Sequence, residues 1–158
     1  MSSTTIEQLI QKRWKFVPAV RDSFHSIPTR FTSVPLDLWH FVSSYQTFCN
    51  ADETQWLISA ADYQNAAAEG FNWNEFETIS LRAAANDQAT IEKITSFWDQ
   101  HLPVFMRVDG EYAYAAYCLA GENYGCYVAG REPEFEEVSV VGRSLSEFQA
   151  WVLRGADT

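Results

Sequence analysis

The sequence predicts an α+β domain, in which helices occupy most of the first two thirds of the chain, strands follow, and one helix closes it. Two observations carry this prediction. Apolar residues recur at helical spacing in most of the chain before residue 100, and they alternate with period two from residue 104 onward. The connections between the later strands are short, which favours antiparallel pairing. We therefore expect a single domain over 1–158, with an antiparallel or mixed sheet of about five to six strands and helices packed around it.

The first 30 residues are predicted to form a short amphipathic helix and then an irregular connection. Thr4 or Thr5 can cap this helix. Its apolar face consists of Ile6, Leu9, Ile10 and Trp14. Prolines and scattered aromatic residues between Lys15 and Val34 indicate an ordered segment without regular structure.

The segment from Pro35 to residue 98 is predicted to be mainly helical. Pro35 suits the first turn of a helix, because its missing N–H is not needed there. The apolar stripe of that helix is Leu38, Trp39, Val42 and Tyr45. The β-forming residues at 54–59 predict a strand. Two further helices follow, and Asn86 and Asp87 separate them.

The second half of the chain predicts a meander of four strands and a closing helix. The expected strands are 104–108, 112–119, 126–129 and 138–141. Turn-forming residues rich in glycine separate them. Ser144 and Glu147 have the spacing of a capping box, in which each side chain accepts a hydrogen bond from a free backbone N–H at the start of the helix.

The charge of the chain is strongly negative and unevenly distributed. The formal net charge is −10, from 21 acidic and 11 basic residues. Residues 1–31 carry a net charge of +3, whereas residues 32–158 contain six basic and 19 acidic residues and carry −13. This field would repel a phosphate backbone and attract a basic protein, although acidity can also serve solubility alone. We expect no nucleic acid and no membrane among the partners.

Location and redox state are predicted from the same composition. No apolar run reaches the roughly 18 residues of a membrane span, and the first residues lack the order of a signal peptide. Three cysteines are an odd number, which suits a reducing compartment. Cys118 and Cys126 flank a predicted turn and can face each other across a hairpin, but buried thiols in strands are usually inert. We expect a cytoplasmic protein without a metal or cofactor.

The known catalytic motifs are missing from the sequence. It contains no nucleophile elbow, no phosphate-binding glycine loop and no cluster of histidines and carboxylates on one element. His25, His40 and His101 are scattered along the chain, and each suits a surface or structural position. A small hydrolase that uses His40 or His101 with a nearby carboxylate remains an alternative.

The sharpest charged feature is an acidic run just before the last predicted strand. A solvated strand edge guarded by charge is the commonest reason for such a run, and an interaction surface is the other. The candidate protein-binding residues are Glu132, Glu134, Glu136 and Glu137 of this run, with Asp109, Glu111, Glu122 and Tyr124 from neighbouring turns. Because successive hairpins alternate ends, only Asp109 and Glu111 are expected to share an end of the sheet with the run.

Four short sequence segments, taken in their order along the chain, resemble the SUKH superfamily, which contains a fungal cell-wall-assembly regulator and many bacterial toxin-immunity proteins. They are Val34-Pro35-Leu36-Asp37-Leu38-Trp39-His40-Phe41, Asn74-Glu75-Phe76-Glu77-Thr78-Ile79-Ser80-Leu81, Leu102-Pro103-Val104-Phe105 and Ser146-Glu147-Phe148-Gln149-Ala150-Trp151. The resemblance covers a core at 31–154. The chain departs from the family at 48–53, where members often have a glycine-rich turn.

The resemblance implies a compact α+β domain without catalytic residues. For bacterial members it also implies binding and neutralising a cognate secreted toxin, often a nuclease. The family has no invariant toxin-contacting motif, so the candidate residues above rest on charge alone. We expect an immunity protein that captures a basic toxin domain electrostatically. The alternatives are an intracellular regulatory or scaffold domain of the same fold that binds a host protein, and the small hydrolase.

Overall fold

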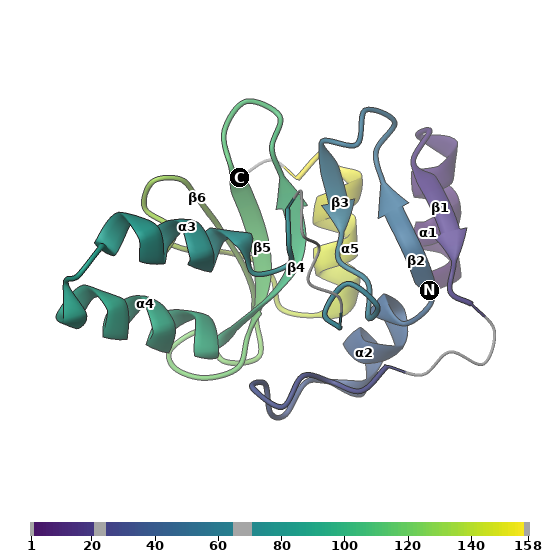
Figure 1. Ribbon diagram of the computed structural model, residues 1–158. Coiled ribbons are helices and arrows are strands. Elements are labelled where there is room, and N and C mark those ends of the chain that lie inside the picture. The colour runs from purple at the N-terminus through teal and green to yellow at the C-terminus, as the bar shows by residue number, and fades with distance from the viewer. Residues whose placement is uncertain (1, 21–24, 65–70, 157–158) are drawn as a thin grey trace.

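The computed structural model describes residues 2–20, 25–64 and 71–156, and this part of the chain forms seven strands and five helices (Figure 1). In chain order they are α1 (Ser2–Gln11), β1 (Lys15–Pro18), α2 (Leu36–Val42), β2 (Tyr45–Cys49), β3 (Gln55–Leu57), α3 (Glu75–Ala84), α4 (Gln88–Asp99), β4 (His101–Arg107), β5 (Ala113–Cys118), β6 (Tyr127–Arg131), β7 (Ser139–Gly142) and α5 (Leu145–Leu153). The α+β class and the closing helix are confirmed.

The strands form one antiparallel sheet whose order follows the sequence, from β1 at one edge to β7 at the other. Every neighbouring pair is antiparallel, including β3 and β4, which are separated in sequence by α3 and α4. The sheet has more strands than the five to six expected. The meander predicted for the second half of the chain therefore extends over the first half as well.

The two strands that the sequence did not predict are β1 and β2. The connection after residue 15 begins with β1, where Phe16 pairs with Phe48 and their rings meet edge-on at 5.1 Å. Tyr45 was expected on a helix face, but α2 ends at Val42 and Tyr45 begins β2. Its hydroxyl donates to the carbonyl of Ile58 at 2.9 Å. Both expectations were wrong because pairing between distant segments overrides local propensity.

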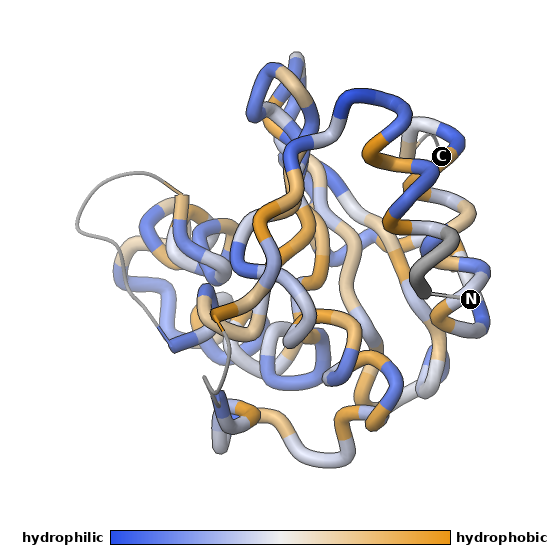
Figure 2. The backbone as a smooth tube through the Cα atoms, turned by 90° about the vertical axis from the view of Figure 1, so that its right-hand side faces the viewer, coloured by the Kyte–Doolittle hydropathy of each residue, from blue (hydrophilic) through white to orange (hydrophobic). Residues whose placement is uncertain are grey.

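Helices cover both faces of the sheet (Figure 1). On one face, α5 packs through Trp151 on Phe105, with ring centroids 5.4 Å apart. On the other face, Trp98 of α4 contacts Tyr114 at 4.9 Å. Figure 2 shows largely apolar strands in the middle of the molecule and hydrophilic residues in turns and on the outer sides of helices. The core is thus divided into two layers by the sheet.

The start of the closing helix α5 follows the predicted capping chemistry, whereas α1 already begins at Ser2, so the cap expected at Thr4 or Thr5 was wrong. The Ser144 hydroxyl accepts from the Glu147 N–H at 3.2 Å, and the Glu147 carboxylate accepts from the Arg143 N–H at 3.1 Å. The capping box is confirmed, with the amide of Arg143 rather than of Ser144 as the second donor. Asp87, which was expected only to separate two helices, also caps α4 by accepting from the Thr90 N–H at 3.3 Å.

A partly buried ion pair ties the segment before α2 to α3 and α4. The Arg30 guanidinium donates to both carboxylate oxygens of Glu77 at 2.6 Å and to Asp99 at 2.7 Å. The hydrogen bond to Glu77 raises the pKa of Arg30 further above its ordinary value, although burial opposes this rise. This bidentate geometry positions the two helices relative to the chain that precedes them.

Two further observations concern the pairing of the cysteines and the possibility of a membrane-spanning helix. Cys49, Cys118 and Cys126 are all free thiols. Within the ranges that the structure describes, none of the helices has the length and apolar character needed to cross a membrane.

Candidate protein-binding site

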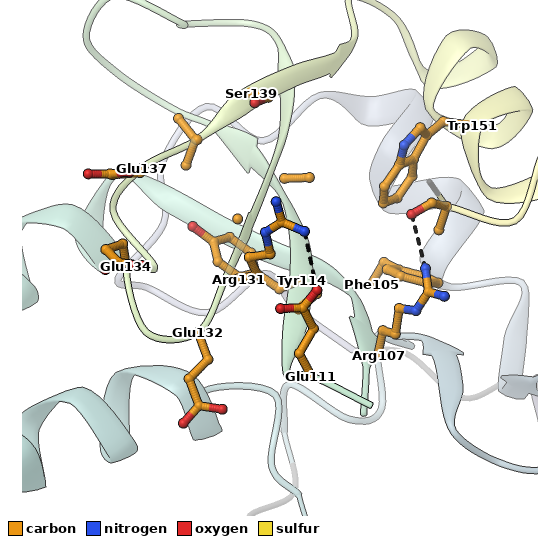
Figure 3. A pocket seen from close by; sticks show the side chains of 15 residues that line it. Phe105, Arg107, Glu111, Tyr114, Arg131, Glu132, Glu134, Glu137, Ser139 and Trp151 are labelled. Carbon is orange, nitrogen blue, oxygen red and sulfur yellow. Dashed lines mark hydrogen bonds and ion pairs between the residues drawn. The ribbon is translucent and has the colours of Figure 1, made fainter. Parts of the chain in front are cut away.

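A hollow of about 590 Å³ opens beside the C-terminal end of α5 (Figure 3). It lies over one end of the sheet, where β4 and β6 finish and β5 and β7 begin. It is lined by Phe105, Arg107, Glu111, Ala113, Tyr114, Ala129, Gly130, Arg131, Glu132, Glu134, Glu137, Val138, Ser139, Trp151 and Ala156. We call this region the rim hollow.

The rim hollow exists because neighbouring strands carry small residues here. Ala113 and Ala129 line it beside the larger Phe105. Their partners across the β5–β6 ladder are Arg131 and Ala115, respectively. An alanine projects only a methyl group from the sheet, so space remains between α5 and the turns that larger side chains would fill.

The loop 132–138 is held against the sheet by a buried aromatic residue. Phe135 is only 3% exposed and stacks on Phe76 of α3 at 4.9 Å. Its carbonyl accepts from the Tyr114 hydroxyl at 2.5 Å. A Cβ at Gly130 would lie 2.7 Å from the Tyr114 hydroxyl oxygen and 2.8 Å from that carbonyl, so the close approach requires glycine.

With Phe135 turned inward, the neighbouring carboxylates are exposed. Glu132, Glu134 and Glu137 line the rim hollow, and Glu111 lines it from the β4–β5 turn. Figure 3 shows Glu134 and Glu137 on one side, Glu111 beside Arg131 in the middle, and Trp151 on the other side. Among the described residues, no ion pair joins Glu132, Glu134 or Glu137 to a basic group.

Two arginines that the sequence analysis did not select also line the rim hollow. Arg131 contacts Glu111 at 3.2 Å, and the two side chains are 62% and 59% exposed. Arg107 contacts Asp109 at 2.5 Å and donates to the carbonyls of Gly155 and Ala156 at 3.2 Å. Both arginines end a strand, but the sequence alone does not show which strand ends face a hollow. The rim hollow therefore combines an acidic rim with two basic groups.

Asp109 belongs to the same end of the sheet but does not line the rim hollow. Burial acts to raise the pKa of its carboxyl group. Hydrogen bonds from Gln55 and Arg107 outweigh burial, and the pKa lies below its ordinary value. Asp109 is thus engaged within the protein and holds Arg107 in place.

The structure brings some of the predicted residues together and separates others. Glu111 and the acidic run share one end of the sheet, as the alternation of hairpin ends predicted. Glu136 is exposed but does not line the rim hollow. Glu122 and the 60% exposed Tyr124 lie in the β5–β6 turn, at the opposite end of the strands. They form no common surface with the acidic run.

The histidines lie outside this site. His101 is buried, stacks on Phe97 at 3.9 Å and has its Nδ1 2.6 Å from the Phe97 carbonyl. Burial lowers its pKa. His40 is exposed on α2. Over the described ranges, no histidine pairs with a carboxylate, and no group of three or more potential metal ligands is found.

Comparison of the chain with models of protein families, with curated proteins and with solved structures found no match.

Proposed function

We propose that this protein is a non-catalytic binding domain that captures a basic protein at the rim hollow. The observation that carries the proposal is the placement of Glu111, Glu132, Glu134 and Glu137 around one concavity. Three of these carboxylates have no ion-pair partner in the described part of the chain. Lysine or arginine side chains of a partner would supply the missing counter-charges.

The role that we propose is that of a cytoplasmic immunity protein of the SUKH type, which neutralises a cognate bacterial toxin. The four sequence segments described above, in their order along the chain, support the family. The negative charge supports a basic partner. A nuclease domain must attract a phosphate backbone and is therefore basic around its substrate groove. A domain with −13 on residues 32–158 competes for that groove, and electrostatic steering speeds the encounter.

The shape of the rim hollow supports the same partner chemistry. Its alanine-lined floor leaves room for the aliphatic stem of a lysine or arginine, while the rim carboxylates lie within reach of the charged head. The exposed Arg131–Glu111 pair contributes little to stability and can be rearranged at small cost. Glu111 can thus exchange Arg131 for a cation of the partner.

The test begins with co-expression and co-purification of this protein with the product of the adjacent open reading frame. Association rates are then measured at low and high salt for the parent and for a double variant, Glu134→Lys with Glu137→Lys. We expect the association rate at low salt to fall about tenfold or more, and its salt dependence to become less steep.

The matched control carries Glu92→Lys and Glu122→Lys, which change the net charge equally on exposed residues away from the rim hollow. We expect this variant to keep its association rate within about threefold of the parent. Equal effects of the two double variants would show that net charge, and not the rim hollow, attracts the partner.

A further inference from the structure

The two outer strands of the sheet, β1 and β7, differ in how they are protected. Each contains four residues, and each has one register irregularity against its neighbour. An outer strand offers backbone N–H and C=O groups to another chain unless charge, proline or a covering segment blocks it.

The β1 edge carries two such protections within the strand. Lys15 places a cation at its start and forms an ion pair with Glu53 at 3.5 Å. Pro18 ends the strand and has no N–H to offer. A further strand would therefore meet a charged side chain at one end of β1 and a missing donor at the other.

The β7 edge has neither protection within the strand, because the nearest charges, Glu137 before it and Arg143 after it, lie outside its four residues. It consists of Ser139, Val140, Val141 and Gly142, with no charge and no proline. Ser139 and Val140 are exposed, and Val140 is 40% accessible. The pairing with β6 shifts at Val141, so the first two residues are the regular part of the strand. This regular part follows directly after the acidic run.

We propose that β7 is a docking edge, to which an extended segment of the partner protein adds as a further strand. The proposal rests on the proposed function and specifies how the partner binds. The segment carries lysine or arginine at the end that lies beside Glu134, Glu136 and Glu137. Backbone pairing with β7 provides affinity, and these carboxylates select a basic sequence.

The docking edge is continuous with the rim hollow. Ser139 belongs to β7 and lines the rim hollow, and Glu137 and Val138 line it just before the strand. A strand added at β7 would thus lie next to the hollow. A second copy of this chain is a less suitable occupant, because each copy carries a net charge of −10 and the two would repel each other.

The experiment uses the full chain, labelled with nitrogen-15, and a synthetic peptide of nine residues. The peptide alternates valine and threonine and has three lysines at one end. Two control peptides have glutamate in place of lysine, or two adjacent prolines that remove donors from both edges of the strand. We expect the lysine peptide to shift the amide signals of residues 139–142 and slow their hydrogen exchange, while residues 15–17 of β1 stay unchanged.

Each control has a defined expectation. The glutamate and proline peptides should bind at least tenfold more weakly than the lysine peptide. The protein variant Val140→Lys should weaken binding of the lysine peptide at least tenfold, whereas Val17→Lys, which adds the same charge to β1, should change it less than threefold. A thermal unfolding curve for each variant shows whether it is folded.

Three outcomes would overturn the docking edge. Shifts confined to Glu111 and residues 132–137 would leave electrostatic capture standing but remove strand addition. Equal binding of the lysine and proline peptides would likewise exclude strand addition and leave electrostatic capture standing. Protection of residues 139–142 without peptide, together with a concentration-dependent dimer, would assign the edge to a second copy of this chain.

A different outcome would overturn the proposed function alone. In that case the double variant Glu134→Lys with Glu137→Lys would associate with the partner protein as fast as the parent does, while β7 would still bind the lysine peptide.

Discussion

The two faces of the central strands are packed in opposite ways. On the α3–α4 face, Phe76 is 1% exposed and stacks on Tyr112 and Phe135, with Tyr114 beside it. On the other face, at the same end of the sheet, the floor is made of alanine. At this end of the sheet the strands are therefore densely packed on one face and leave a hollow on the other, beyond the contact of Trp151 with Phe105. A complete core on both faces would have removed the rim hollow.

The two arginine–glutamate pairs show the same contrast. Arg30 and Glu77 have side chains 26% and 9% exposed and interact through two bonds of 2.6 Å. Arg131 and Glu111 have side chains 62% and 59% exposed and interact at 3.2 Å. Solvent screens the second pair, so that it contributes little to folding and stays available for exchange.

The largest effect is expected from the packed face. Phe76→Ala removes a fully buried ring, and such truncations cost about 3–5 kcal/mol in the free energy of unfolding. The loop 132–138 should also loosen, because Phe135 loses its stacking partner. Urea denaturation measures the first effect, and hydrogen exchange of residues 132–138 the second. A loss below about 1 kcal/mol would contradict the assignment of this face as the stabilising one.

The second largest effect on stability is expected when the two arginine–glutamate pairs are compared. Glu77→Gln leaves Arg30 without a full counter-charge, and we expect it to destabilise the fold by about 2–3 kcal/mol, less than a fully buried pair because Arg30 is partly exposed. Glu111→Gln is the matched control and should cost less than about 1 kcal/mol. The two variants are compared by denaturant unfolding under one set of conditions, and equal losses would abolish the distinction.

A smaller effect tests the open face. Ala113→Leu fills the floor of the rim hollow from a half-buried position. We expect stability to stay within about 0.5 kcal/mol, as for other substitutions away from a packed core. Binding of the basic partner that we propose should fall about tenfold, which is 1.4 kcal/mol. Titration calorimetry measures the affinity, and an unchanged affinity would show that the floor takes no part in binding.

The smallest effect concerns pH. Burial lowers the pKa of His101 in the folded protein, so the unfolded chain binds a proton first as the pH falls. The stability due to this group is therefore complete above its ordinary pKa of about 6.5 and decreases as the pH falls toward the folded pKa. His101→Gln should flatten the pH dependence of stability below about 6.5, measured by denaturant unfolding across this range. Identical profiles of stability against pH for the parent and His101→Gln would show that another group causes the pH dependence.

The acidic run illustrates how far the sequence leads. Alternating hairpin ends were enough to predict that Glu111 and residues 132–137 share an end and that Glu122 does not. The inward turn of Phe135 was not predictable, because it depends on Phe76, which lies 59 positions earlier in the sequence. The arginines in the rim hollow were missed for the same reason: only the packed turns show which side chains face a concavity.

The sequence by itself determined the elements whose signals are local. These are the period-two strands from β4 to β7 and the capping box of α5, in which hydrogen bonds and turn geometry involve residues close in the chain. Only the tertiary structure decided that residues 15–18 and 45–49 are strands and that an alanine floor lies beneath an acidic rim. Strand pairing and concavity arise from contacts between distant residues, and local propensity contains no information about them.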